Sequence, residues 1–148
     1  MRIKPDDVAL NKAAIIERCI RRIREEYAAA PDLQNYTHID AMTLNIERAC
    51  QACIDLAMHI VAGQHLGMPQ SSSDAFRLLT ESGLISPETK KAMRTMTGFR
   101  NIAIHQYEEL DLGVLRFIAE EAWNDLVTFC RELGLKINPR GRCRTDSR

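Results

Sequence analysis

The feature that most constrains this chain is the spacing of its apolar residues, which follows a helical period in every long segment. The first such segment carries an apolar stripe from Val8 to Tyr27, and Pro31 follows its end. No stretch of useful length alternates apolar and polar residues as a half-buried strand does. The sequence therefore predicts an all-α fold.

Four more helices are expected along the chain. The second runs from about Asp40 to Leu66, and a short third lies within residues 71–83, with a serine N-cap and a glycine after its end. The fourth begins with Ser86 as N-cap and Pro87 as its first helical residue. The last runs from about Asp111 to Leu133. The pattern predicts a bundle of four longer helices and one short helix.

Size and composition indicate one domain with a core of its own. The chain has 148 residues, of which 45% are apolar, enough to exclude intrinsic disorder. We expect residues 1–135 to form the domain and the basic stretch 136–148 to form a flexible arm. No uninterrupted apolar run is long enough for a membrane span, and the charged N-terminus does not resemble a secretory signal.

The cysteines and the charge balance narrow the setting further. Five cysteines, an odd number spread through apolar stretches, suit free thiols in a reducing cytoplasm better than a disulfide framework. Lysine plus arginine and aspartate plus glutamate both number 20. The net charge of the molecule therefore gives no argument for nucleic-acid binding, although it does not exclude a local basic groove.

One polar cluster stands out, in the stretch GFRNIAIHQY. It places Arg100, Asn101, His105 and Tyr107 within eight residues, interleaved with apolar side chains. Arg100 and His105 are five apart, which puts them about 140° apart around a helix. Asn101 and His105, four apart, face the same way. Arg100 and His105 can therefore meet only through the long reach of the arginine, near a helix end, or across a partner subunit.

These residue types suit the cleavage of RNA without a metal ion. A histidine can take a proton from a ribose 2′-OH or give one to the leaving oxygen. An arginine can stabilise the negative charge that builds on the phosphate, and an asparagine can orient either group. The spacing alone is also common among ordinary surface residues, so this hypothesis needs wider support.

That support comes from a resemblance that extends beyond the motif. GFRNIAIHQY resembles the R-x4-H-x-Y signature of the HepT toxins, within the HEPN superfamily of α-helical ribonucleases. The segments ERACQACIDLAMHIVA, GMPQSSSDAFRLLTESGLI and MRTMTGFRNIAIH follow the family's run in order and spacing. The resemblance covers about Asn11 to Leu133, so the arm departs from it.

The resemblance implies a HEPN-type homodimer whose two motifs meet in a cleft between protomers. It implies a metal-independent endoribonuclease that cuts tRNA or mRNA, in which Arg100 and His105 match the catalytic pair and Asn101 the polar residue after the arginine. It further implies a partner, a minimal nucleotidyltransferase antitoxin of the MntA type, which silences the toxin by transferring AMP to Tyr107. No cofactor is implied. AMP on Tyr107 would add charge and bulk that compete with an RNA backbone.

An alternative is a non-catalytic HEPN subunit that binds nucleotide or positions a nucleotidyltransferase. The same surface would then bind phosphate without cleaving it. The pair Cys50 and Cys53 has no second half-site and is assigned to packing instead of zinc or redox chemistry. Asp55 and His59, four apart, are expected to form a structural hydrogen bond.

Two basic stretches are candidates for RNA contact or for ordinary solvated faces. The first stretch comprises Lys90, Lys91 and Arg94. If it lines the cleft, it would supply phosphate contacts that the neutral net charge of the chain does not predict. The second is RCIRRIR, with Arg18, Arg21, Arg22 and Arg24.

Overall fold

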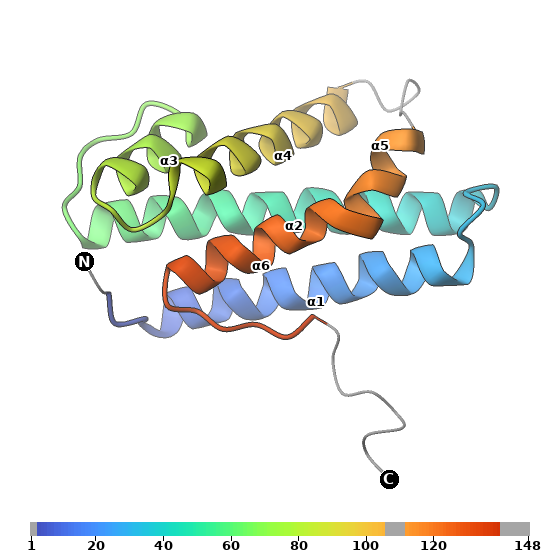
Figure 1. The fold of residues 1–148 in the computed structure, drawn as a ribbon, viewed down its shortest axis with the longest axis horizontal. Helices are drawn as coiled ribbons and strands as arrows, with labels where there is room; N and C mark the ends of the chain where they lie inside the picture. Colours follow the sequence, from blue (N-terminus) through green and yellow to red (C-terminus); the bar gives the residue numbers. More distant parts are fainter. Residues whose placement is uncertain (1–2, 106–111, 140–148) are drawn as a thin grey trace, which may run out of the picture.

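The computed structural model describes residues 3–105 and 112–139, and for residues 101–105 it describes the backbone alone. Within these ranges all regular structure is helical, which confirms the all-α prediction (Figure 1). The elements in chain order are α1 (Asp7–Ala29), α2 (Tyr36–Gly63), α3 (Ser72–Glu81), α4 (Pro87–His105), α5 (Leu112–Phe117), the π-helical η2 (Ile118–Ala122) and α6 (Trp123–Glu132). Among them, no helix is both long and apolar enough to cross a membrane.

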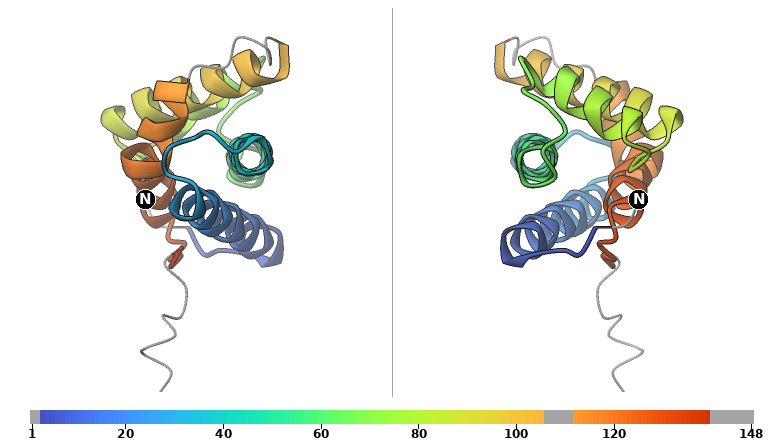
Figure 2. Two further views of the ribbon diagram at one scale, coloured as in Figure 1. Left: turned by 90° about the vertical axis from the view of Figure 1, so that its right-hand side faces the viewer. Right: turned by 90° about the vertical axis from the view of Figure 1, so that its left-hand side faces the viewer.

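The long helices form a ring around one core. α1 packs on α2, α2 on α4, α4 on α6, and α6 on α1, while α3 packs against α2 and α4. Consecutive long helices run in opposite directions (Figure 1). Seen end-on, α1 and α2 lie on one side of the molecule and α6 on the other, with α3 and α4 across the top (Figure 2). This is the four-helix arrangement that short connections favour.

Most residues of the apolar stripes read from the sequence form this core, but Val8, the first residue of the first stripe, is exposed. One apolar stripe of the last predicted helix is buried throughout, and it comprises Leu115, Ile118, Ala119, Ala122, Leu126, Phe129 and Cys130. The rings of Phe76 and Phe129 meet edge to face at 5.7 Å, which joins α3 to α6. Cys50 and Cys53 are fully buried, so their assignment to packing is confirmed.

The helix starts follow from side-chain caps. At the start of α4 the Ser86 hydroxyl accepts a hydrogen bond from the Thr89 N–H at 3.1 Å, as predicted. α2 begins at Tyr36, earlier than the predicted Asp40, because the Asn35 side chain accepts from the Thr37 N–H at 2.9 Å. The first turn of α2 is largely polar, so the spacing of apolar residues did not reveal this earlier start.

The last predicted helix is interrupted by one π turn, η2, between α5 and α6. A π turn accommodates an extra residue without breaking the helix, so its effect on periodicity is small. Here it precedes Trp123, which is buried and carries the Arg24 guanidinium over its ring at 4.3 Å. The predicted last helix is thus present within the described residues, with one π turn that the sequence pattern did not predict.

The chain beyond α6 continues along α1 for the few residues described there. Ile137 packs against the core, and the Asn138 N–H donates to the Glu17 carboxylate at 2.5 Å. The boundary proposed at residue 135 stays a prediction, because residues 140–148 lie outside the described part of the chain.

Candidate active site on α4

The polar motif begins in the C-terminal half of α4, one continuous helix through His105. Arg100 is half-buried. For Asn101 and His105 only the backbone is described, and Tyr107 lies outside the described residues. On this helix positions 100 and 105 do not share a face, whereas positions 101 and 105 do. A site that contains both Arg100 and His105 therefore needs a long reach by the arginine or a second copy of the chain.

Arg100 lies against α2, close to a buried thiol. Burial raises the pKa of the Cys50 thiol to about 12, and the Arg100 charge opposes that rise while Glu47 adds to it. The same thiol donates a hydrogen bond to the Met96 carbonyl oxygen at 3.4 Å. The Arg100 charge thus lies close enough to α2 to act on the Cys50 thiol.

Packing on one side and a partly buried polar tether at its start fix the position of α4. Met93 and Met96 are buried and pack α4 onto the core. At its start, the Glu132 carboxylate of α6 accepts from the Ser86 N–H at 2.7 Å and from the Thr89 hydroxyl at 2.8 Å. These contacts set where the motif lies relative to the rest of the bundle.

Three cations precede the motif on the same helix. Lys91 and Arg94 are exposed and Lys90 is half-buried, and none of them forms an ion pair with another described residue. Position 94 is seven residues before 101, so the two positions follow one stripe of the helix. Arg94 therefore lies on the same side of α4 as positions 101 and 105.

The other predicted pair is not formed. His59 bonds to the Asp6 carboxylate at 2.7 Å, while Asp55 accepts from Gln51 at 2.8 Å and from Lys12 at 3.4 Å. Asp6 precedes α1 and caps it, so His59 pairs with the start of α1, while Asp55 pairs with Gln51 on its own helix and with Lys12 on α1. Among the described residues, no cluster of three or more His, Cys, Asp or Glu could hold a metal ion.

Comparison with solved structures defines the class of this bundle. A tri-AMPylated HEPN toxin of Shewanella oneidensis, solved in complex with its MNT antitoxin, superposes with a TM-score of 0.83 at 39% identity. The match covers 88% of this chain and 98% of that one. The fold is thus that of a HEPN toxin.

Sequence comparisons then give the family. The mRNA nuclease HepT of Shewanella oneidensis is 41% identical over 125 residues, which is 84% of this chain and 94% of that protein. The tRNA nuclease HepT of Aphanizomenon flos-aquae is 31% identical over 61 residues, covering 41% of this chain and 42% of that protein. The model of the HepT-like ribonuclease family matches residues 16–133. The chain belongs to the HepT-like ribonuclease family.

Proposed function

We propose that the protein is the toxin of a toxin–antitoxin pair, an endoribonuclease that cuts tRNA or mRNA without a metal ion. The observation that carries the proposal is the R-x4-H motif on α4, with its half-buried arginine near Cys50 of α2, in a chain that matches a HepT nuclease over 84% of its length. Free, buried thiols and an RNA substrate suit the cytoplasm.

The active site is composite and needs two copies of the chain. Since Arg100 and His105 do not share a face of α4, two motifs facing each other across a twofold axis bring all the required groups to one phosphate. One His105 accepts the proton of the 2′-OH as O2′ bonds to phosphorus. The partner's His105 donates a proton to the 5′ oxygen as the P–O5′ bond breaks, while arginine stabilises the added negative charge. Asn101, on the face of position 105, orients the imidazole or the phosphate.

A surface on α5 supports the second copy. Val114 and Phe117 are three residues apart, so they share one face of α5, and both are exposed, as is Leu112. α5 lies at the end of the bundle where α4 ends (Figure 1). An exposed apolar face of this kind is typical of a protein interface.

Control of this activity is assigned to Tyr107. A nucleotidyltransferase antitoxin of the MntA type would transfer AMP from ATP to this hydroxyl, two residues beyond His105, with pyrophosphate as the leaving group. The solved HEPN toxin that resembles this chain is tri-AMPylated and bound to its MNT antitoxin. A phosphate and an adenosine at this position would compete with RNA for Arg100 and for the α4 cations.

The test is RNA cleavage by purified dimer in the presence of EDTA. Wild-type protein is expected to leave 2′,3′-cyclic phosphate ends, and Arg100→Ala and His105→Ala are each expected to lose at least about 100-fold in kcat. His65→Asn is the matched control, since it removes an exposed imidazole from a left-handed position that asparagine tolerates. Wild-type cleavage by either alanine variant would refute the catalytic assignment.

Expression in cells separates the toxin from the non-catalytic subunit. Growth arrest that a nucleotidyltransferase partner reverses supports the toxin, and harmless overexpression supports the subunit. Mass spectrometry of protein made with and without the partner then tests the modification. An adenylyl group on Tyr107 that is absent from Tyr107→Phe is the expected result.

A further inference from the structure

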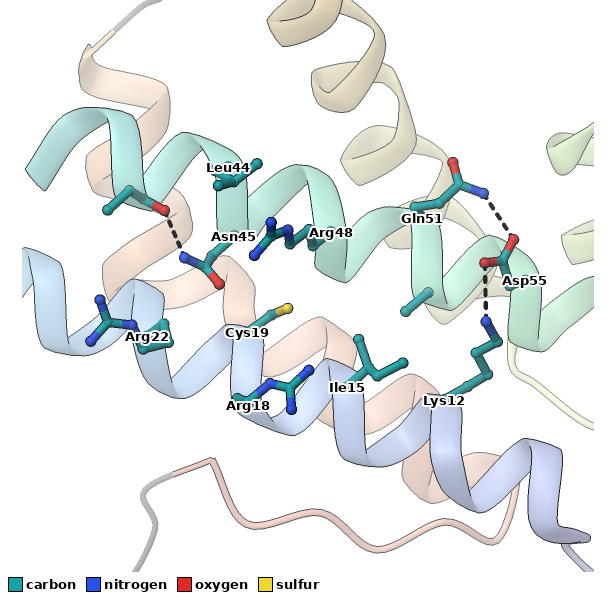
Figure 3. Close-up of a pocket in the computed structure, with 12 residues that line it drawn as sticks. Lys12, Ile15, Arg18, Cys19, Arg22, Leu44, Asn45, Arg48, Gln51 and Asp55 are labelled. Carbon is teal, nitrogen blue, oxygen red and sulfur yellow. Dashed lines mark hydrogen bonds and ion pairs between the residues drawn. The ribbon is translucent and has the colours of Figure 1, made fainter. Parts of the chain in front are cut away.

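We propose that a groove between α1 and α2 binds the phosphodiester backbone of the RNA strand on either side of the cleaved bond. The inference rests on the proposed ribonuclease function and adds a second contact surface to it. The groove opens on the face of α1 and α2 away from α6, which lies behind them in Figure 3.

The groove is long compared with a single phosphate. Its volume is about 610 Å³. Its lining residues on α1 run from Lys12 to Arg22, ten positions apart, which corresponds to about 15 Å along the helix. Ile15 and Cys19 contribute an apolar wall between the cations (Figure 3). An extended chain of charged and apolar groups fits this shape better than a compact free anion does.

The charge of the groove is positive at its centre. At the ends the cations are neutralised, because Lys12 pairs with Asp55 at 3.4 Å and Arg22 with Glu26 at 2.6 Å. Arg18 on α1 and Arg48 on α2 are exposed, and neither forms an ion pair within the described residues. Two guanidinium groups on facing helices are thus available to an anion.

Both arginines lie close to Cys19 in the apolar wall of the groove. Burial raises the pKa of the Cys19 thiol, and the charges of Arg18 and Arg48 oppose that rise from the two sides. The exposed Leu44 lies beside Arg48 on the α2 wall (Figure 3). Arginine forks that bind phosphate next to apolar side chains that accept a base or sugar are the usual elements of single-strand binding sites.

The groove adjoins the candidate active site across α2. Arg48 and Cys50 lie on the same turn of α2, with Arg48 in the groove and Cys50 beside Arg100 and α4. The two sites are therefore separated by about the width of one helix, roughly 10 Å. A strand held at Arg100 reaches the groove by crossing the solvent-facing ridge of α2.

The test is RNA binding by a groove variant, in a His105→Ala background that prevents cleavage. Arg18→Gln with Arg48→Gln is expected to raise the Kd for a fluorescein-labelled single-stranded RNA about tenfold, measured by fluorescence anisotropy. The slope of log K against log salt is expected to fall by about 1.4, since each phosphate contact on a single strand contributes about 0.7. Arg18→Lys with Arg48→Lys keeps both charges and should keep the slope.

The matched control is Arg131→Gln with Lys136→Gln, which removes two exposed charges on or just after α6. Its Kd and slope should equal those of the parent. If the groove variant behaves like this control, the inference is wrong. Dissociation of the dimer by the groove variant, or loss of antitoxin binding with RNA affinity unchanged, would also overturn it, because another partner would then occupy the groove.

Kinetics in the otherwise wild-type protein distinguish this inference from the proposed function. Removing a contact that RNA makes equally in the ground and transition states raises KM and leaves kcat unchanged. That result for the groove variant supports the inference, and a lowered kcat with unchanged KM contradicts it. Failure of the ribonuclease proposal itself appears separately, as His105→Ala protein that cleaves at the wild-type rate.

Discussion

The chemistry of individual cysteines in this protein is set by where they pack. Cys19, Cys50, Cys53 and Cys130 are free and buried. Burial raises the pKa of the Cys50 and Cys130 thiols to about 12, and raises those of Cys19 and Cys53 as well. A thiol with a raised pKa stays protonated at neutral pH, so these groups are poor nucleophiles.

We therefore expect the four buried thiols to resist alkylation in the folded protein. A Cys143→Ser variant leaves only these four. At pH 8 a thiol with a pKa of about 12 is thiolate in roughly one molecule in 10⁴. Iodoacetamide should therefore leave the native variant unmodified and should add four groups in guanidinium chloride, as counted by mass spectrometry. Rapid labelling of Cys50 in native protein would contradict the packing described for it.

At the scale of elements, the helix that carries the motif depends on a tether from α6. The Glu132 carboxylate accepts hydrogen bonds from the Ser86 N–H at 2.7 Å and the Thr89 hydroxyl at 2.8 Å. It thus satisfies the Ser86 N–H, which has no helical partner, and the hydroxyl of Thr89, which is itself buried. A negative group there also suits the positive end of the helix dipole.

Glu132→Ala is expected to lower the free energy of unfolding by about 2 kcal/mol, because hydrogen bonds to a charged acceptor are lost at a partly buried site. Glu132→Gln keeps an acceptor oxygen and should lose about half as much. Urea unfolding curves check this, with the midpoint shifted and the m-value unchanged.

Glu121→Ala is the control, since Glu121 is exposed and its side chain forms no ion pair in the described chain. It should unfold at the wild-type urea concentration. Equal effects of the two alanine variants would show that the tether contributes nothing specific.

Features that depend on neighbours in the sequence were predictable, and contacts between helices were not. Ser86 and Pro87 fixed the start of α4, because a cap acts on the next few residues. The bond from His59 to Asp6 joins residues 53 apart, so spacing within α2 could not reveal it. The groove between Arg18 and Arg48 was missed for the same reason: each arginine alone resembles a solvated face.

For the candidate site, the sequence supplied the residue types but not their assembly. The motif identified Arg100 and His105, and helix geometry showed that they do not converge on one helix face. The location of Arg100 against α2, next to Cys50, required the packing of α4. The way two motifs meet depends on how two chains pack together. Local sequence patterns within one chain do not reveal that packing.

At the scale of the whole molecule, the proposed activity requires a dimer, and α5 offers the apolar face for it. Phe117 is 52% exposed and lies one turn from the exposed Val114. Burying such a side chain contributes roughly 1.5–3 kcal/mol to the free energy of association. In a twofold dimer each protomer buries its own α5 face, so this contribution is made twice. Dimerisation and cleavage should therefore fail together when this face is changed.

We expect Phe117→Glu to raise the dimer Kd at least about 100-fold, because it removes apolar burial and places an unpaired charge in the interface. Met68→Glu is the matched control: Met68 is 87% exposed and lies in the connection between α2 and α3. Analytical ultracentrifugation over a range of concentrations measures the effect, and cleavage assays at the same concentrations should show activity that rises with the dimer fraction. If the Phe117→Glu protein stays dimeric, the dimer interface does not include this face of α5. If it cleaves RNA as a monomer, the active site is not shared between two copies.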